Sequence, residues 1–395
     1  MANSLLSSPS LSGTMAESSL YQVMGVGITD SILLIGHADA KVMYEPYQVY
    51  SAKKAVEFLN SDPNSPLLRA FLEAYNSGCK DIWLLAAAPM SEYESVISER
   101  TTIKAAYSNK TFYERYYERL TTAYSSISGY ELGEIVVPVE AVFYDAGGVD
   151  FLTQLINYCE SYFTTIGAVC LGVLGTRIPT FTSTSVTAMA TDSRLPLVAD
   201  AGKFVIIAVG EGTITNVQMS TSYVANFAVK TAALMATTTL DRSIAGLTMP
   251  GVSTLVGNDL TQTQIEQLSQ AKLNVVGRTA RGKRGYAYQT RLMTDNTLGQ
   301  DGSDFWSMTQ MHMVANIINQ IRAFGYSYVG TTYLSKFKDT VYHYMNRLIS
   351  DRLIRDFSLN IQESDLGESA AVYVSILPIL GVRQITFQIE VGPGA

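Results

Sequence analysis

The sequence has few charged residues. Asp, Glu, Lys and Arg make up 16% of its 395 residues, whereas soluble domains usually carry about 25%. Its 28 basic residues are outnumbered by 35 acidic ones, and the formal net charge is −7 at pH 7. A general nucleic-acid binder would show a basic excess instead. Low charge combined with 24 Tyr is typical of a surface covered by other subunits, although a monomer with a Ser- and Thr-rich surface fits equally well.

Cysteine and long apolar runs are also scarce. Cys79, Cys159 and Cys170 are an odd number, form no CxxC pair and lie in apolar segments, which predicts buried, reduced side chains in a protein made in the cytosol. The first residues lack the basic start and apolar stretch of a signal peptide. No apolar run approaches the roughly 20 residues that span a bilayer. We therefore expect a soluble protein of two or three domains that does not contact membranes directly.

Signatures of catalysis are missing as well. There is no Walker A loop, and the run Gly25-Val26-Gly27 is followed by Asp30 where a dinucleotide fingerprint needs its third glycine. The run from Gly251 to Leu255 lacks the second glycine of a nucleophile elbow. We predict no catalytic residues and no cofactor. An α/β enzyme whose site is assembled from sequence-distant polar residues remains the alternative.

Metal-ligand spacing is not found either. His37, His312 and His343 are far apart in sequence, and we expect the last two to be partly buried and hydrogen-bonded on helices. Glu363, Asp365 and Glu368 form an acidic loop, for which a solvated turn is favoured over a weak cation site. No metal site is predicted.

The pattern of apolar residues predicts alternating strands and helices. Residues 1–20 are rich in Ser and have no period, which is typical of an arm. Beyond this arm, α/β organisation with a parallel pair follows from the order of elements. The expected strands are residues 21–27, 31–36, 81–87, 135–138, 141–144, 167–174 and 204–210. The expected helices are residues 53–60, 66–76, 91–128, 149–163, 223–237 and 261–271, and glycines 246, 251 and 257 indicate a domain seam.

A basic glycine loop is the most distinctive local feature. Arg278, Arg281, Lys283, Arg284 and Arg291 are five cations with no acid among them. The first four lie between strand-like residues 273–276 and 286–293, and Arg291 lies within the second of these ranges. This layout predicts a hairpin. Its tip could contact an acidic protein face, contact nucleic acid or be solvated; with an acidic whole chain and no aromatic stacking platform, we favour protein contact.

The last third of the sequence predicts two helices followed by two strands. The helices are residues 308–324 and 335–357, and the strands are residues 370–377 and 383–391. The second helix has an apolar stripe, and five basic residues around it outnumber three acidic ones. The basic residues, which could face a partner or be solvated and paired within the helix, are Lys336, Lys338, Arg347, Arg352 and Arg355.

The final strand alternates polar and apolar residues strictly. Ile385, Phe387, Ile389 and Val391 would share one buried face. Because this strand ends the sequence, it could pair within its own sheet or with the sheet edge of another subunit.

The order of these elements resembles the contractile phage tail sheath proteins. The resemblance rests on the helix at 261–271, the strand Leu273-Asn274-Val275-Val276, the basic glycine turn and the strand that follows it. It continues through Trp306, a helix, a turn at Gly325, a long helix and the closing strands. Residues 32–36, Pro46, 66–75, Gly78 and 81–87 match the start of many sheaths, so the resemblance covers most of the chain. Residues 286–288 read Tyr-Ala-Tyr and lack the Trp-Gly that the family often has there.

The resemblance implies a mechanical, non-enzymatic role. Sheath subunits stack as six-fold rings around a tail tube, contract when a baseplate triggers them, and drive the tube through the host envelope. Neighbours exchange N- and C-terminal arms that add strands to the C-terminal sheet. The implied fold is mixed α/β, with a C-terminal helix–sheet domain completed by exchanged strands. The implied parts are an arm at 1–20, outer α/β domains at 21–245, an inner, tube-facing domain at 246–383 and a linker strand at 384–395.

The same resemblance implies the partners and the location. The partners would be copies of the chain in hexameric rings, the tail tube, and baseplate and tail terminator proteins, with no direct contact to nucleic acid. The protein would be assembled in the host cytoplasm and reside in the virion tail. The cationic residues, above all Lys336, Lys338 and Arg347, become candidates for the surface that faces the tube.

Overall fold

A computed structural model describes residues 30–60, 64–93, 110–144, 148–177, 180–197, 204–216, 221–240, 242–257, 259–281, 287–296, 307–325, 333–363 and 370–378. The chain divides into two compact units, residues 1–327 and residues 328–395. The predicted arm at 1–20, the predicted strand at 21–27 and the closing strand at 384–391 lie outside the described residues. The domain boundaries expected from the sequence stay predictions.

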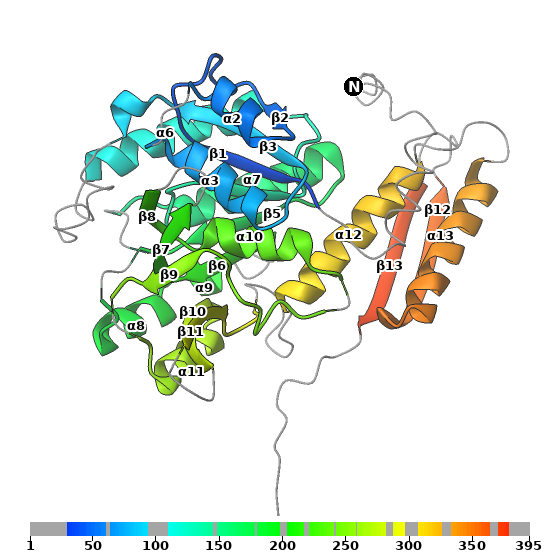
Figure 1. Ribbon diagram of the computed structural model, residues 1–395. Coiled ribbons are helices and arrows are strands. Elements are labelled where there is room, and N and C mark those ends of the chain that lie inside the picture. The colour runs from blue at the N-terminus through cyan, green and yellow to red at the C-terminus, as the bar shows by residue number, and fades with distance from the viewer. Residues whose placement is uncertain are drawn as a thin grey trace, which may run out of the picture. The chain divides into compact units, whose positions relative to one another are not determined.

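The first unit is built on an eight-stranded sheet of mostly parallel strands, in the order β11-β10-β6-β5-β4-β1-β3-β2 (Figure 1). Neighbours from β10 to β3 are parallel, and only the two edge pairs, β10–β11 and β3–β2, are antiparallel. These strands are β1 (Ile32–His37), β2 (Tyr47–Val49), β3 (Ile82–Ala88), β4 (Ile135–Pro138), β5 (Leu171–Gly175), β6 (Val205–Val209), β10 (Asn274–Arg281) and β11 (Ala287–Leu292).

Helices cover both faces of this sheet. α3 and α10 pack on one face and on each other, while α6 and α7 pack on the other face. Strands covered in this way need apolar residues on both sides, and every residue of β1, β4, β5 and β6 is buried. The helices of this unit are α2 (Ala52–Phe58), α3 (Pro66–Asn76), α6 (Lys110–Ser126), α7 (Phe151–Ile166), α8 (Ser183–Ala190), α9 (Arg194–Leu197), α10 (Ala228–Thr237), α11 (Gln262–Gln270) and α12 (Met308–Gly325), with a 3-10 turn η1 at Met90–Glu92.

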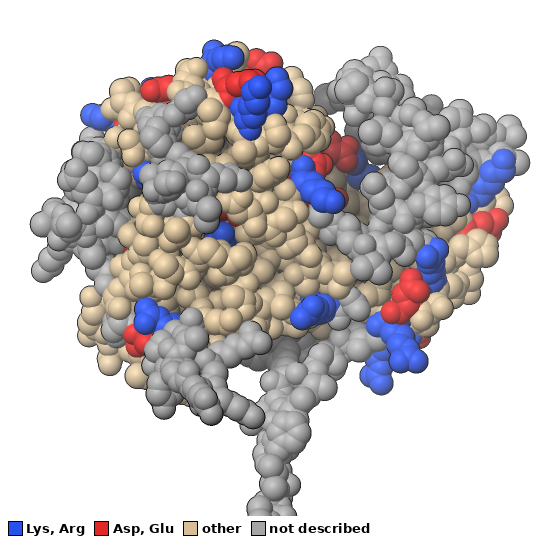
Figure 2. Space-filling model, in the orientation of Figure 1, with Lys and Arg blue, Asp and Glu red and all other residues tan. Residues whose placement is uncertain are grey.

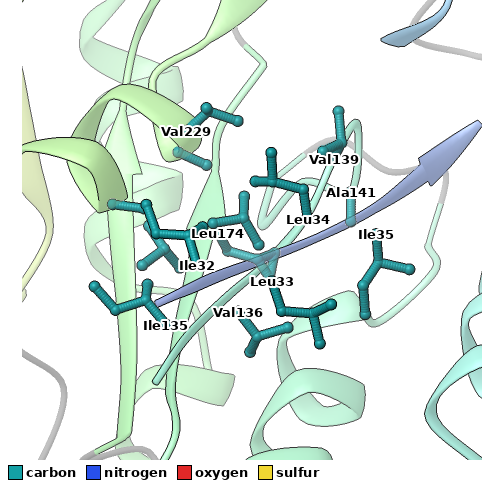
Figure 3. Packing of buried hydrophobic residues seen from close by; sticks show 14 of the residues in the cluster. Ile32, Leu33, Leu34, Ile35, Ile135, Val136, Val139, Ala141, Leu174 and Val229 are labelled. Atoms are coloured by element: carbon teal, nitrogen blue, oxygen red, sulfur yellow. The ribbon is translucent and has the colours of Figure 1, made fainter. Parts of the chain in front are cut away.

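Side chains of β1 alternate between the two helical layers. Leu34 points to the side of Val229 on α10, while Leu33 points to the opposite side, beside Val136 (Figure 3). All four are buried in one continuous apolar core. Full burial of each such side chain contributes roughly 1.5–3 kcal/mol, so the sheet is the rigid part of the unit.

A smaller antiparallel sheet adjoins this body, in the order β8-β7-β9. Its strands are β7 (Glu211–Asn216), β8 (Thr221–Asn226) and β9 (Val252–Leu255). The sequence pattern predicted a helix over 223–237, but its first turn is β8 and the helix α10 begins only at Ala228. Pairing of β8 with β7 overrides the local helical preference of this segment.

Most of the elements predicted for this unit are confirmed. The parallel pair is β1–β3, the helix predicted over 66–76 is α3, and the basic loop is flanked by an antiparallel hairpin. Part of the helix predicted over 91–128 is α6, which buries Phe112, Tyr113 and Tyr116, each at most 2% exposed. No strand forms over 141–144, where Val142 makes a single bridge to Gly175.

The second unit contains one helix and one hairpin in its described part. They are α13 (Tyr333–Ser350), β12 (Ile354–Glu363) and β13 (Ala370–Pro378). The strand predicted over 370–377 is confirmed, whereas the helix predicted over 335–357 is too long. The chain leaves the helix at Arg352, whose φ is 60°, and the Leu353 N–H bonds back to the Leu348 carbonyl at 2.9 Å. This is a Schellman-type end without the usual glycine, so the sequence carries no stop signal and β12 was missed.

Candidate assembly interface

The hairpin of the second unit has one partly buried apolar face and one exposed face, although only two strands form it. β12 and β13 pair over nine residue pairs, from Ile354↔Pro378 to Glu363↔Ala370. Along both strands, exposed side chains alternate with buried or half-buried ones. One face presents half-buried or buried apolar residues and the other presents exposed ones. The first face consists of Phe357, Leu359, Ile361, Val372, Val374 and Ile376, and the second includes Ser358, Asn360, Tyr373, Ser375 and Leu377.

The apolar face is the one that α13 meets. α13 packs against β12, and the Tyr342 ring lies 5.6 Å from the Phe357 ring. The helix buries a stripe at helical spacing toward the unit's interior, as the sequence predicted. Its fully or nearly fully buried members are Phe337, Val341, Tyr344, Met345 and Leu348.

Both edges of this hairpin lack a strand partner within the described residues. β12 pairs with β13 and β13 pairs with β12, and the sheet contains no third strand there. An isolated two-stranded sheet is marginally stable in water, and an open edge exposes a row of backbone N–H and C=O groups that can pair with another chain. The geometry is that of a sheet ready to be extended by β-strand addition.

The five cations singled out in this unit are all exposed. Lys336 and Lys338 lie on the first turns of α13, Arg347 on its last turn, and Arg352 and Arg355 follow it. Figure 2 shows blue side chains gathered where α13 ends, next to red ones. Arg347 approaches Asp351 at 3.5 Å, but both side chains are about half exposed, so this pair contributes little. The other four form no ion pair with another described residue.

The histidines occupy three different environments. His312 is buried and contacts Asp30, as expected of a hydrogen-bonded core histidine. His343 is exposed, so the expectation of partial burial was wrong. His37 lies among the rings of Tyr93, Phe112 and Tyr116 and is 1% exposed. Burial lowers the pKa of His37 to about 4, so its ring is neutral at physiological pH.

The basic hairpin of the first unit is described only at its base. Lys283 and Arg284 lie outside the described residues, and Arg281 ends β10. Arg278 finds an acid that the local sequence did not show, because its Nε lies 3.7 Å from the Asp259 carboxylate. Arg291 donates to Gln289 at 3.1 Å. The preference for an acidic protein partner at this hairpin stays a prediction.

The carboxyl edge of the main sheet holds a polar cluster that sequence reasoning missed. This edge is where open α/β sheets bind ligands. Arg177, which follows β5, pairs with Glu140 after β4 and with Glu211 on β7, the latter at 3.3 Å. Tyr113 of α6 accepts from Arg177 at 3.4 Å. The only sign of this cluster in the sequence is that Glu140 and Arg177 each come two residues after a buried strand, β4 and β5.

A small cavity beside this cluster is lined by residues that include Arg69, Glu73, Glu140, Tyr223 and Asn226. Glu73 is 3% exposed and accepts from the Tyr223 hydroxyl at 2.8 Å. Burial raises the pKa of Glu73 to about 7. A perturbed carboxyl in a cleft makes a candidate enzyme site. Here Arg177 is paired with Glu140 and Glu211, and Glu73 accepts from Tyr223, so the contacts of the cluster join the two sheets. We interpret it as structural.

Metal and membrane sites were also sought in the described part of the chain. No three His, Cys, Asp or Glu side chains there converge as a metal site. None of the helices described combines the length and apolarity needed to cross a membrane. Cys79, Cys159 and Cys170 are buried and free, in agreement with the core role expected of them.

Comparison with known proteins identifies the fold. No protein-family model and no curated protein matches the sequence. Solved structures do match. The sheath tail protein Lin1278 from Listeria innocua superimposes with a TM-score of 0.64 and 11% identity, over 92% of this chain and 95% of that one. The contracted sheath of the extracellular contractile injection system PVC gives a TM-score of 0.63 and 10% identity, over 93% and 94%. The contracted helical sheath of the anti-feeding prophage gives 0.58 and 9%, also over 93% and 94%.

The chain therefore has the mixed α/β fold of contractile sheath proteins. The structural neighbours named here are sheath proteins, which are structural proteins and not enzymes. The resemblance proposed from the order of sequence elements is confirmed at the level of the fold.

Proposed function

We propose that this protein is the structural subunit of a contractile tail sheath. It polymerises as stacked hexameric rings around a tail tube, and contraction of the polymer drives the tube through the host envelope. It has no catalytic role. Besides copies of itself, it contacts the tail tube, the baseplate and the tail terminator, and it resides in the assembled tail. Two of the similar structures are of the anti-feeding prophage baseplate, which supports the baseplate as a partner.

The observation that carries the proposal is the two-stranded sheet of the second unit. Its edges are open within the described residues, and its apolar face is only half covered at Val372, Val374 and Ile376. A partner strand of about eight residues would add several backbone hydrogen bonds worth roughly 1 kcal/mol each. Burial of Ile385, Phe387, Ile389 and Val391 from a neighbour would add roughly 1.5–3 kcal/mol per side chain. Such a link can hold while rigid domains repack around it.

Electron microscopy of the purified full-length protein tests the proposal. We expect helical tubes, because the link between subunits is encoded in the chain. A monodisperse monomer under all assembly conditions would contradict it and would favour the alternative of an enzyme with a site built at the carboxyl edge of the main sheet.

Deletion of residues 384–395 tests the link itself. We expect the truncated chain to lose tube formation while its first unit keeps wild-type thermal stability. A matched control replaces Gln384, Gln388 and Glu390 with Ser, which changes the polar face of the strand and leaves Ile385 and its apolar partners in place. Tubes from the truncated chain at wild-type yield would rule out this strand as the connection.

A further inference from the structure

The smaller sheet of the first unit meets the main body at a cavity between three elements. The polar residues that line it are Arg69 and Glu73 of α3, Glu140 after β4, and Tyr223 and Asn226 of β8. α3 packs on the main sheet, β4 is a strand of that sheet, and β8 belongs to the smaller one. A molecule bound in the cavity would therefore contact helix, main sheet and smaller sheet together.

Glu73 brings to this cavity a polar atom that no described residue satisfies. Its Oε1 accepts from the Tyr223 hydroxyl at 2.8 Å, whereas its Oε2 is buried and has no hydrogen-bond partner among the described residues. The residue as a whole is 3% exposed. Leaving a buried carboxyl oxygen without a partner is costly, and folded proteins ordinarily satisfy such an atom with a side chain or an ordered water.

The buried charges at the cavity indicate that Glu73 keeps a proton. Five ionisable side chains in and next to its wall, each at most 6% exposed, are Arg177, Lys230, Glu73, Glu140 and Glu211. A proton on Glu73 leaves two positive and two negative charges, which avoids the cost of an unpaired buried charge. Arg69 is only half-buried, so solvent screens its charge. Burial raises the pKa of Glu73 to about 7, in agreement. Because Oε1 accepts from Tyr223, the proton lies on Oε2 and needs an acceptor.

The cavity has the size and the polarity to hold one water molecule. The space open to the centre of a water molecule is about 20 Å³, and roughly 10–15 Å³ is needed to hold one. A buried water also needs about two to four polar partners, and Arg69, Glu140 and Asn226 line the cavity together with Glu73. A metal ion fits less well, because the buried charges already balance and no three His, Cys, Asp or Glu side chains of the described residues converge as a metal site.

We propose that this cavity is a binding site for one ordered water molecule that joins the smaller sheet to the main body. The water accepts from Glu73 Oε2 and donates to Glu140 and to Asn226, whose Oδ1 accepts from the Ala228 N–H at 3.1 Å and has a second lone pair. A bond through water is nearly as favourable in enthalpy as a direct one. β8 is thus held to α3 twice, directly by Tyr223 and indirectly by the water. The site belongs to the single subunit and does not depend on polymerisation.

A structure of the full-length protein below pH 7, at a resolution that shows ordered solvent, tests the site directly. We expect a density peak within hydrogen-bond distance of Glu73 Oε2 and of a polar atom of Glu140 or Asn226. A cavity without a peak would overturn the proposal, and so would a peak with the several short oxygen contacts of a bound metal ion. A crystal of the unassembled subunit serves as well as a polymer, so this failure is distinct from failure of tube formation.

Three variants separate the water from the direct bond. Glu73→Gln keeps a donor and an acceptor, so we expect it to keep the water, whereas Glu73→Met offers neither and is expected to lose it. Tyr223→Phe removes only the direct bond and is expected to keep the peak. Hydrogen exchange of β8, residues 221–226, should stay within about twofold of wild type in Glu73→Gln and rise at least about fivefold in Glu73→Met, with Tyr223→Phe between them.

The control is Glu118→Met, the same change at an exposed position of α6, which should leave exchange of β8 unchanged. An equal rise in Tyr223→Phe and Glu73→Met would show that the water contributes nothing to holding β8 and would overturn its bridging role. The peak in the wild-type structure decides whether the water is bound even if a variant fails to fold.

Discussion

Individual buried ionisable residues decide how the stability of this protein depends on pH. Glu73 and His37 are both almost fully buried, and burial moves their pKa values toward the neutral form, up for the acid and down for the base. The two contributions have opposite signs. The folded protein holds a proton on Glu73 that the unfolded chain releases, and it excludes from His37 a proton that the unfolded chain binds.

We predict that the deprotonation of Glu73 lowers the free energy of unfolding as the pH rises from about 4.5 to 7. Its folded pKa of about 7 exceeds the ordinary 4.5, so its contribution is fully present below the ordinary value and is lost as pH rises through the folded one. The change amounts to about 3 kcal/mol. Glu73→Gln should remove it, and urea unfolding of both proteins at a series of pH values would measure the difference.

The control for this prediction is the exposed Glu118→Gln on α6, which should keep the wild-type pH profile. If Glu73→Gln and wild type lose stability in parallel between pH 4.5 and 7, the carboxyl does not hold the proton assigned to it.

At the scale of elements, the second unit depends on the contact between one helix and one hairpin. A two-stranded sheet needs a third strand or a helix to be stable, and α13 supplies that cover through residues such as Val341, which is fully buried. The sequence showed the apolar stripe of α13 and the strand β13. It did not show β12, because Arg352 ends the helix with a left-handed turn that ordinarily takes Gly.

We predict that Val341→Asp unfolds the second unit and leaves the first intact. An unpaired carboxylate buried at this position would cost several kcal/mol, more than a marginal hairpin can offset. Hydrogen exchange should lose protection over 333–378 and keep it in β1 and β5. Asn346→Asp, an exposed change on the same helix, is the matched control. Protection of 333–378 in the Val341 variant would show that the hairpin does not rely on α13.

At the scale of the whole molecule, a chain of net charge −7 concentrates exposed cations on its second unit. Within that unit Lys336, Lys338, Arg352 and Arg355 have no described acidic partner. A surface of this kind steers and orients a complementary partner more than it adds affinity. In the proposed sheath we expect that partner to be the tail tube.

We predict that reversing Lys336, Lys338 and Arg347 to Glu reduces co-assembly with the tail tube at least about tenfold at low salt, with a smaller effect at high salt. Co-sedimentation of sheath and tube would measure it. The control reverses Lys41, Lys53 and Lys54, which are equally exposed on the first unit. Equal co-assembly of both triple variants would remove the assignment of this surface to the tube.

The sequence by itself determined the α/β core and the identity of its apolar faces. Buried parallel strands such as β1 and β5 read as continuous apolar runs, and α3 and α11 begin at capping residues Ser65 and Thr261, because these signals are local. Features that depend on local sequence, such as buried strands and helix starts, could therefore be predicted.

Only the tertiary structure decided which distant polar groups meet. Asp30 and His312 are 282 residues apart, and Arg177 gathers carboxylates from two other elements, Glu140 and Glu211. No rule based on sequence spacing predicts such contacts, because they depend on the order of strands in the sheet. The hairpin of β12 and β13 was missed because α13 ends at Arg352 without a glycine, and because a local pattern does not say how many strands share a sheet.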